Sequence, residues 1–411
     1  MSDQGSTTIL AGQLVDVRSG TLEQDQAIVI RDGRVQSVTP RGQDTPQGEV
    51  IDLSSMTVLP GLIDCHAHLA GQLEDGQGYA GLVTTTPARE VMAGTRNARA
   101  ALMAGFTSVR DVGSFYAFTD CALRDGIEAG WIPGPRMQCA GAYITVPGGG
   151  GDVTGLAPGV EVPRDLRFGV SKSVDEVRDA VRRILGGGAE VIKVIATGAV
   201  LTEGTDPGAP EFSEAEIRAA VDEAALYRIH VAAHAHGAEG IKRAVRAGVR
   251  SIEHGSLMDD ESIAMMAEAG TYLVADIYNG DFINEMGEAQ GWTPDVMRKN
   301  RETTEAQREG FRKAVAAGVR IAYGTDSGVF PHEFAARQLP YMVRHGMTPM
   351  QGLQAATIVA AEMMSWDDRV GSISPGTFAD IIAVEDDPIA TELERMTDVA
   401  FVMKGGEVHK G

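Results

Sequence analysis

The sequence predicts an α/β protein in which a (β/α)8 TIM barrel carries a small β-sandwich domain built from both chain termini. Three observations support this prediction. Short runs of Val, Ile and Leu lie near both ends of the chain, a helix–glycine–strand unit recurs between them, and eight strand candidates alternate with helical spacers. A (β/α)8 barrel typically has roughly 250 residues, which fits the middle of this chain with some loop insertions.

Both ends of the chain have the pattern of short antiparallel strands. The Asp-Gly pair at 32–33 separates two β-branched runs, as in a hairpin, and the Gly-Gly pair at 405–406 does the same near the other end. Because the termini of a domain usually lie close together, we expect residues 1–60 and 371–411 to form one composite domain. Residues 61–370 would then form the barrel.

The middle of the chain repeats one unit: a helical stretch with apolar residues three or four apart, then Ala-Gly, then a short strand. Glycine after the last helical turn is a C-cap signal, and repeated αβ units are typical of a parallel sheet. No G-x-G-x-x-G follows the first strand, so we favour a closed barrel over an open dinucleotide-binding sheet. The copies are residues 97–112, 242–255, 261–276 and 312–326, and the eight strand candidates are LPGLIDCHA, FTSVRDV, RMQCAGAYI, EVIKVIA, HVAAHA, RSIEHG, TYLVADI and VRIAYGTD.

Charge and composition exclude several classes of partner. The chain has 36 Lys and Arg against 57 Asp and Glu, a net charge of −21, which argues against binding nucleic acid or an anionic membrane surface. Its apolar runs are too short to span a bilayer, and the first residues lack the basic start of a signal peptide. The three cysteines form no C-x-x-C pair, which favours a reducing compartment. We therefore expect a cytoplasmic location.

Metal-ligating residue types gather at the carboxyl ends of the predicted strands, where barrel enzymes hold their reactive groups. His66 and His68 are two apart on one strand and therefore face the same side, so that they can bind one cation. A hydrogen-bonded pair of core histidines would have the same spacing. Five of the nine histidines fall at strand ends; the candidates are His66, His68, Lys193, His234, His236, His254 and Asp326.

The string PGLIDCHAHL at 60–69, together with GTDSG at 324–328, resembles the amidohydrolase superfamily. Within it the chain looks most similar to the imidazolonepropionase-related branch of Xaa-Pro dipeptidases and carboxypeptidases, which also contains ochratoxin-hydrolysing amidases. The resemblance implies two Zn²⁺ ions per subunit and a homo-oligomer, with an octamer as one assembly of this branch. It also implies roles for single residues: His66 and His68 bind one metal, His234 and His254 the second, carboxylated Lys193 bridges both, and Asp326 is a ligand and, with His254, a catalytic residue.

The chemistry of a buried lysine agrees with the implied bridge. A plain ammonium beside two divalent cations would be repelled and costly to bury, whereas a carbamate on Lys193 is an anion with two oxygens. A surface lysine is the alternative, which the apolar residues flanking Lys193 on both sides disfavour. The positive charge of two zinc ions exceeds the negative charge of the carbamate, Asp326 and a hydroxide, so the centre keeps a net positive charge. A centre of this kind favours a small substrate with an amide and a carboxylate.

Candidate substrate contacts lie beside these ligands. His236 shares a face with His234 and is expected over the substrate, with a purely structural histidine as the alternative. Tyr143 ends strand three and Tyr278 follows strand seven, and packing would explain either aromatic residue equally well.

Three further positions carry expectations. Related dipeptidases often have a histidine where this chain has Gly150, in a glycine-rich loop at 147–170 that we interpret as a lid. Arg337 is a further candidate contact. Glu253 is expected to point out of the barrel and form an ion pair there.

These residues predict a zinc-dependent hydrolase of amide or peptide bonds. A hydroxide bridging the two ions would attack the carbonyl of an Xaa-Pro-like dipeptide or an N-acyl amino acid, and Asp326 would be general base and acid. A mononuclear hydrolase or deaminase of a cyclic amide or heterocycle, and an ochratoxin-type amidase, are the alternatives. A non-catalytic scaffold is disfavoured because all six ligand positions are filled.

Overall fold

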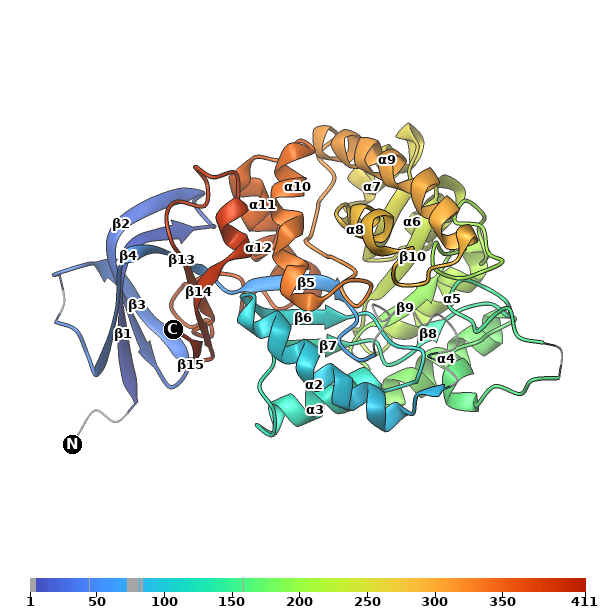
Figure 1. Ribbon diagram of the computed structural model, residues 1–411, viewed down its shortest axis with the longest axis horizontal. Coiled ribbons are helices and arrows are strands. Elements are labelled where there is room, and N and C mark those ends of the chain that lie inside the picture. Colours follow the sequence, from blue (N-terminus) through green and yellow to red (C-terminus); the bar gives the residue numbers. More distant parts are fainter. Residues whose placement is uncertain (1–4, 44, 72–80, 82–83, 158) are drawn as a thin grey trace.

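The computed structural model describes residues 5–43, 45–71, 81, 84–157 and 159–411. Figure 1 shows two parts side by side: a sheet made from both ends of the chain, and a larger part in which helices surround parallel strands. The second part carries the candidate site, at the carboxyl ends of its strands.

The terminal sheet has seven strands in the order β15-β14-β13-β4-β1-β2-β3. The expected hairpin at 32–33 is present: β2 and β3 pair antiparallel with Arg31 opposite Arg34, and both turn residues have positive φ, as a type I′ turn requires. All seven strands belong to one sheet, so the expected β-sandwich is not confirmed. The strands are β1 (Ser6–Asp16), β2 (Thr21–Arg31), β3 (Arg34–Pro40), β4 (Glu49–Pro60), β13 (Ile381–Val384), β14 (Val399–Lys404) and β15 (Glu407–Lys410).

The larger part has parallel strands in two arcs, β5-β6-β7 and β12-β11-β10-β9-β8. The predicted eighth strand forms only isolated bridges, Leu273 with Ile321 next to β12 and Ala67 with Ser327 next to β5. The α/β class is therefore confirmed, whereas the described ladders do not close into one barrel. The strands are β5 (Leu62–Ala67), β6 (Phe106–Asp111), β7 (Arg136–Cys139), β8 (Tyr143–Ile144), β9 (Ile192–Ile195), β10 (Val231–Gly237), β11 (Ser251–Leu257) and β12 (Tyr272–Val274).

Helices cover these strands, as the repeat predicted. Gly248 and Gly270 end α6 and α7 in the left-handed conformation, with φ of 90° and 69°, and a strand follows each of them directly. No described helix is both long and apolar enough to cross a membrane. The helices are α2 (Pro87–Met103), α3 (Thr119–Glu128), α4 (Val174–Gly186), α5 (Glu214–Ala225), α6 (Ala238–Ala247), α7 (Asp260–Ala269), α8 (Asn279–Met286), α9 (Pro294–Ala316), α10 (Gln338–Arg344), α11 (Pro349–Ala355) and α12 (Ile358–Met364).

Candidate active site

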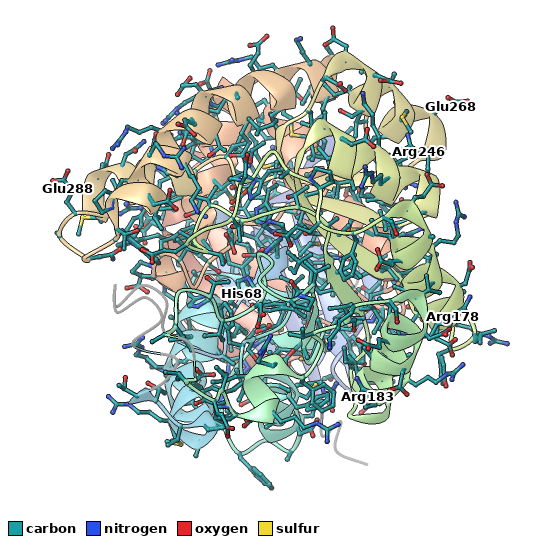
Figure 2. The ribbon with its side chains drawn as sticks, turned by 90° about the vertical axis from the view of Figure 1, so that its right-hand side faces the viewer. His68, Arg178, Arg183, Arg246, Glu268 and Glu288 are labelled. Carbon is teal, nitrogen blue, oxygen red and sulfur yellow. The ribbon has the colours of Figure 1, made fainter. Side chains whose placement is uncertain are left out.

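A cavity of about 370 Å³ lies at the carboxyl ends of the parallel strands, within the range of small-molecule sites. Figure 2 views the molecule from the side opposite the terminal sheet, with His68 near the centre and Glu268 and Glu288 at the periphery. The predicted metal-ligating side chains all line this cavity, namely His66, His68, Lys193, His234, His254 and Asp326, together with His236.

Asp326 meets the two histidines of strand β5. Its Oδ1 lies 3.4 Å from His66 Nε2 and 3.2 Å from His68 Nε2. Burial alone would raise the pKa of Asp326, but hydrogen bonds from the two imidazoles outweigh it and hold that pKa well below its ordinary value. Asp326 is therefore an ionised carboxylate aimed at both ring nitrogens.

Three histidines from β10 and β11 form a second group around the same cavity. Ring centroids lie 4.5 Å apart between His234 and His254 and 4.8 Å apart between His236 and His254. Burial lowers the pKa of His234 and of His236, the latter to about 3, and the neighbouring His254 adds to both shifts. The imidazoles of His234 and His236 are therefore neutral, which is the form that binds metal.

The donor atoms fall into two sets that share His254. In each set the ligand atoms lie within 4.8 Å of one another; the sets are His66, His254 and Asp326, and His234, His236 and His254. Two adjoining cation positions could use these donors. The structure therefore brings together at one cavity the six predicted positions, which come from β5 and the residue after it, β9, β10, β11 and the segment around residue 326, and it adds His236 to them.

Three of these histidines have one ring nitrogen within hydrogen-bond distance of a carboxylate or carbonyl oxygen. His66 Nδ1 lies 2.8 Å from Glu253 Oε2, His68 Nδ1 2.7 Å from the Gly113 carbonyl, and His234 Nε2 3.2 Å from the Gly198 carbonyl. Carboxylate and carbonyl oxygens only accept, so these nitrogens donate. The opposite nitrogen of each ring is then the one that would offer its lone pair to a bound metal. Metal-ligating histidines have this arrangement.

Lys193 lies among these groups on β9. Its side chain is buried, and no described residue makes a hydrogen bond or ion pair with its amine. Burial lowers the pKa of Lys193 to about 8, and Lys193 in turn contributes to lowering the pKa of His66. A part of this amine is therefore uncharged near neutral pH.

The position of Glu253 differs from the one predicted from the sequence. It was expected outside the barrel, but it is fully buried, contacts His66 and lies on the same side of β11 as Ser251, two residues earlier, whose hydroxyl donates to it. His254, with a φ of 68°, breaks the alternation of side chains along β11 and so lines the cavity as well. Asp326, with a φ of 58°, is a second ligand candidate in this sparsely populated region. At both positions the left-handed backbone turns the side chain of His254 or Asp326 towards the cavity, a direction that a regular strand would not give it.

Glu253 is held by an arginine that sequence reasoning missed. Arg110, on β6, donates to Glu253 Oε1 at 2.7 Å, to Ser251 Oγ at 3.1 Å and to the Cys65 carbonyl at 2.6 Å. Burial alone would raise the pKa of Glu253, but Arg110 and then His66 hold that pKa well below its ordinary value. A charged carboxylate behind His66 orients its ring.

The aspartate of the PGLID string ties the two recognised motifs together. Asp64 accepts hydrogen bonds from the His66 and Thr325 amides, each at 3.1 Å, and from the Thr325 hydroxyl at 2.5 Å. The strand that carries His66 and the segment that carries Asp326 are thus joined directly behind the site.

Three other polar residues of the cavity were also missed. Asn279 Nδ2 lies 3.1 Å from Asp326 Oδ2 and 3.2 Å from Asp276 Oδ2, and Gln307 on α9 donates to Asp276 Oδ1 at 2.7 Å. Asp276 Oδ1 also lies 3.1 Å from His254 Nδ1. Asp276 is the last residue but one of the predicted strand TYLVADI, and this position near the carboxyl end was a signal that could have identified it.

The candidate substrate contacts divide into two groups. His236, Tyr143 and Gly150 line the cavity; the Tyr143 hydroxyl donates to the Gly113 carbonyl at 3.0 Å, and His236 Nδ1 lies 2.8 Å from Ser256 Oγ. Tyr278 and Arg337 are not among the lining residues: Arg337 donates to the Tyr278 hydroxyl at 3.3 Å, and Tyr278 packs in an aromatic cluster with Phe282 and Phe330.

The glycine-rich loop is held by a carboxylate. Both Glu211 oxygens lie 2.9 Å from the Gly150 amide nitrogen, and the Thr202 hydroxyl donates to the Gly150 carbonyl at 2.6 Å. The lid function of residues 147–170 stays a prediction.

Glu211 should make stability depend on pH. Burial raises the pKa of Glu211 to about 7, although the Gly150 amide opposes this shift. Its contribution to the free energy of unfolding is therefore fully present below about pH 4.3 and is lost as the pH rises through about 7. We expect Glu211→Gln to remove part of this decline in urea denaturation between about pH 5 and about pH 8. Glu161→Gln, at an exposed position, should keep the wild-type decline; an unchanged decline in Glu211→Gln would contradict the prediction.

Histidines and carboxylates that converge at the carboxyl ends of parallel strands define an α/β protein with a candidate metal centre. The chain belongs to the amidohydrolase family, whose sequence pattern matches residues 57–411, and it is therefore a hydrolase. It is similar to ochratoxinase from Aspergillus niger, with 32% identity over 100% of this chain and 88% of that protein. It is also similar to imidazolonepropionase from Chromobacterium violaceum, with 26% identity over 88% of this chain and 86% of that one.

A solved structure supports the same assignment. The crystal structure of a Xaa-Pro dipeptidase with bound methionine in the active site has a TM-score of 0.91 and 36% identity, over 99% of this chain and 100% of that chain. The resemblance inferred from PGLIDCHAHL is thus confirmed at the level of the family.

Proposed function

We propose that this chain hydrolyses the amide or peptide bond of a small molecule with the help of two zinc ions. The observation that carries the proposal is the convergence of His66, His68, Lys193, His234, His254 and Asp326 on one cavity. Relatives named for a Xaa-Pro dipeptide and for ochratoxin support an amide-bearing substrate. The two arcs of strands and residues 320–327 would act together as one (β/α)8 barrel.

The residues present fit a metal centre. Histidines with one nitrogen fixed by an acceptor, and an ionised Asp326 between two of them, are the donors that zinc prefers. His66, His68 and Asp326 would hold one ion and His234 and His254 the other, with Lys193, carboxylated at its amine, between them. When bound, the ions supply Lewis acidity and water that ionises near neutral pH.

The chain itself would move the proton. Asp326 would take it from the attacking water and pass it to the leaving amine, because Oδ1 faces the cavity while the Asn279 amide holds Oδ2. Arg110 and Glu253 would keep the His66 ring in its orientation, and the buried walls would limit access of bulk water.

Lys193→Met tests the paired metal centre. Because methionine cannot carry a carbamate, we expect the zinc content to fall from two ions per chain to one or none, and amide hydrolysis to fall at least ~100-fold. Lys242→Met, on the exterior helix α6, should leave both unchanged. Metal analysis by mass spectrometry and a screen of dipeptides and N-acyl amino acids with zinc-loaded protein supply the measurements.

One zinc per wild-type chain, with Lys193→Met still active, would contradict this proposal. Such a result would favour the alternative, a mononuclear hydrolase or deaminase of a cyclic amide. The expected homo-oligomer and the cytoplasmic location stay predictions.

A further inference from the structure

We propose that the preferred substrate carries no free carboxylate: the cavity takes an amide flanked by an apolar group that is uncharged or positively charged, and Glu203 sets this preference. The inference rests on the proposed amide hydrolysis. It replaces the carboxylate-bearing substrate that the charge of the metal centre alone favoured.

One part of the outer wall of the cavity is apolar except for one acid; it is formed by Phe115, Leu156, Leu201, Glu203 and Trp292. These five residues line the cavity and are half-buried, whereas the metal-ligating cluster lies deeper. The uncharged hydroxyl residues Thr154 and Thr293 also line the cavity and are half-buried. Leu201 and Trp292 pack together against the buried residues Ile283, Met297 and Val329. A wall of this kind binds the apolar part of a ligand.

No cation outside the metal-ligating cluster lines this cavity. Within the described chain, the lining includes Lys193 and five histidines of the cluster but no arginine and no other lysine. Residues 1–4, 44, 72–80, 82–83 and 158, which are not described, contain no Lys, Arg or His. Lys299, buried behind the wall, donates to the carbonyl oxygens of Ala199 at 3.2 Å and Thr202 at 2.7 Å and is not a lining residue.

The expected carboxylate contacts are also missing. Arg337 donates a hydrogen bond to the Tyr278 hydroxyl, and neither residue lines the cavity. Gly150 has no side chain that could contact a carboxylate. A Cβ at position 150 would lie 3.1 Å from the Ala199 and Ile195 side chains, so these residues fill the place where a larger side chain would begin. The wall at Gly150 is therefore closed by apolar groups.

Glu203 has a free negative charge at this wall. Its Oε2 lies beside Gly155, and no residue in the described part of the chain makes a hydrogen bond or ion pair with its carboxylate. In a half-buried site with low effective dielectric, a substrate carboxylate close to Glu203 would be repelled, and no cation on the wall would compensate. A neutral or cationic group avoids this cost.

Two N-acetyl compounds that share one scissile bond test the proposal. N-acetyl-L-phenylalaninamide and N-acetyl-L-phenylalanine differ in a single charge, and acetate release measures hydrolysis of the same bond in both. We expect wild-type zinc-loaded enzyme to prefer the neutral compound by about tenfold in kcat/KM, a size typical of one like-charge contact. Glu203→Gln should raise kcat/KM for the carboxylate compound by about tenfold and change that for the neutral compound less than about twofold.

Glu268→Gln is the matched control, because it removes the same charge at an exposed position on the periphery, far from His68 in Figure 2. It should leave the preference unchanged. A wild-type preference for the carboxylate compound, or equal effects of Glu203→Gln on both compounds, would overturn the inference while amide hydrolysis stands. Absence of acetate release from any amide would instead count against the proposed function.

Equilibrium binding decides the inference even without turnover. Trp292 is one of three tryptophans and lines the cavity, so binding should change its fluorescence, and Trp292→Phe should remove this signal. In the Asp326→Asn background we expect tighter binding of the neutral compound, and we expect Glu203→Gln to remove the difference. Tighter binding of the carboxylate compound would overturn the proposal.

Discussion

Replacing Asp326 with asparagine should lower kcat for amide hydrolysis by about a thousandfold, because general acid–base catalysis typically contributes 10²- to 10⁴-fold. Asparagine keeps the shape of the side chain, but it cannot take a proton from the attacking water. The carboxylate is ionised in the folded protein, held so by hydrogen bonds from His66 and His68 that outweigh its burial. Steady-state kinetics with a substrate found in the amide screen would measure the loss.

The zinc content of Asp326→Asn must be measured beside its activity, because Asp326 also faces two predicted ligands. Loss of activity with both metals retained would support its part in proton transfer. Asp367→Asn, at an exposed position, should behave as the wild type. Unchanged kcat in Asp326→Asn, with metal bound and a confirmed substrate, would show that another group moves the proton.

Replacing Arg110 with methionine should lower the free energy of unfolding by about 3–5 kcal/mol, the usual cost of breaking a buried ion pair from one side. The Arg110 side chain is 3% exposed and that of Glu253 is fully buried, so the carboxylate would stay in the interior without its cation. The Ser251 hydroxyl and the Cys65 carbonyl would lose a partner as well. Urea denaturation of the zinc-loaded protein measures the change.

A double variant distinguishes the uncompensated charge from lost packing. Arg110→Met combined with Glu253→Gln should be more stable than Arg110→Met alone, because glutamine carries no charge into the interior. Arg312→Met, which breaks an exposed pair with Glu309, should cost less than about 1 kcal/mol. Equal losses in the Arg110 and Arg312 variants would contradict the assignment of a buried ion pair.

The convergence of the candidate metal ligands could be predicted from the sequence because these residues follow local rules. His66 and His68 share a face through the two-residue period of a strand, and the carboxyl ends of parallel strands meet at one edge. The terminal hairpins could be predicted for the same reason, since Asp-Gly and Gly-Gly favour the positive φ of type I′ turns.

Other parts of the site could not be predicted from local rules. Glu253 was expected to point outward because it is next to His254, and only the left-handed backbone at His254 lets both side chains face the interior. Gln307 reaches Asp276 from α9, a helix far along the chain. Tyr278 was expected at the substrate, but it packs against aromatic residues from α8 and the segment after residue 327.

The sequence by itself determined which chemical groups stand at the strand ends and which family of hydrolases they belong to, because residue type and short-range period need no partner. The tertiary structure alone decided the charge and orientation of those groups and which residues surround them in the cavity. Their pKa values, the Arg110–Glu253 pair behind His66 and the acid at the outer wall all depend on residues far apart in the chain. Burial and long-range contact, which no local pattern encodes, are the physical reason.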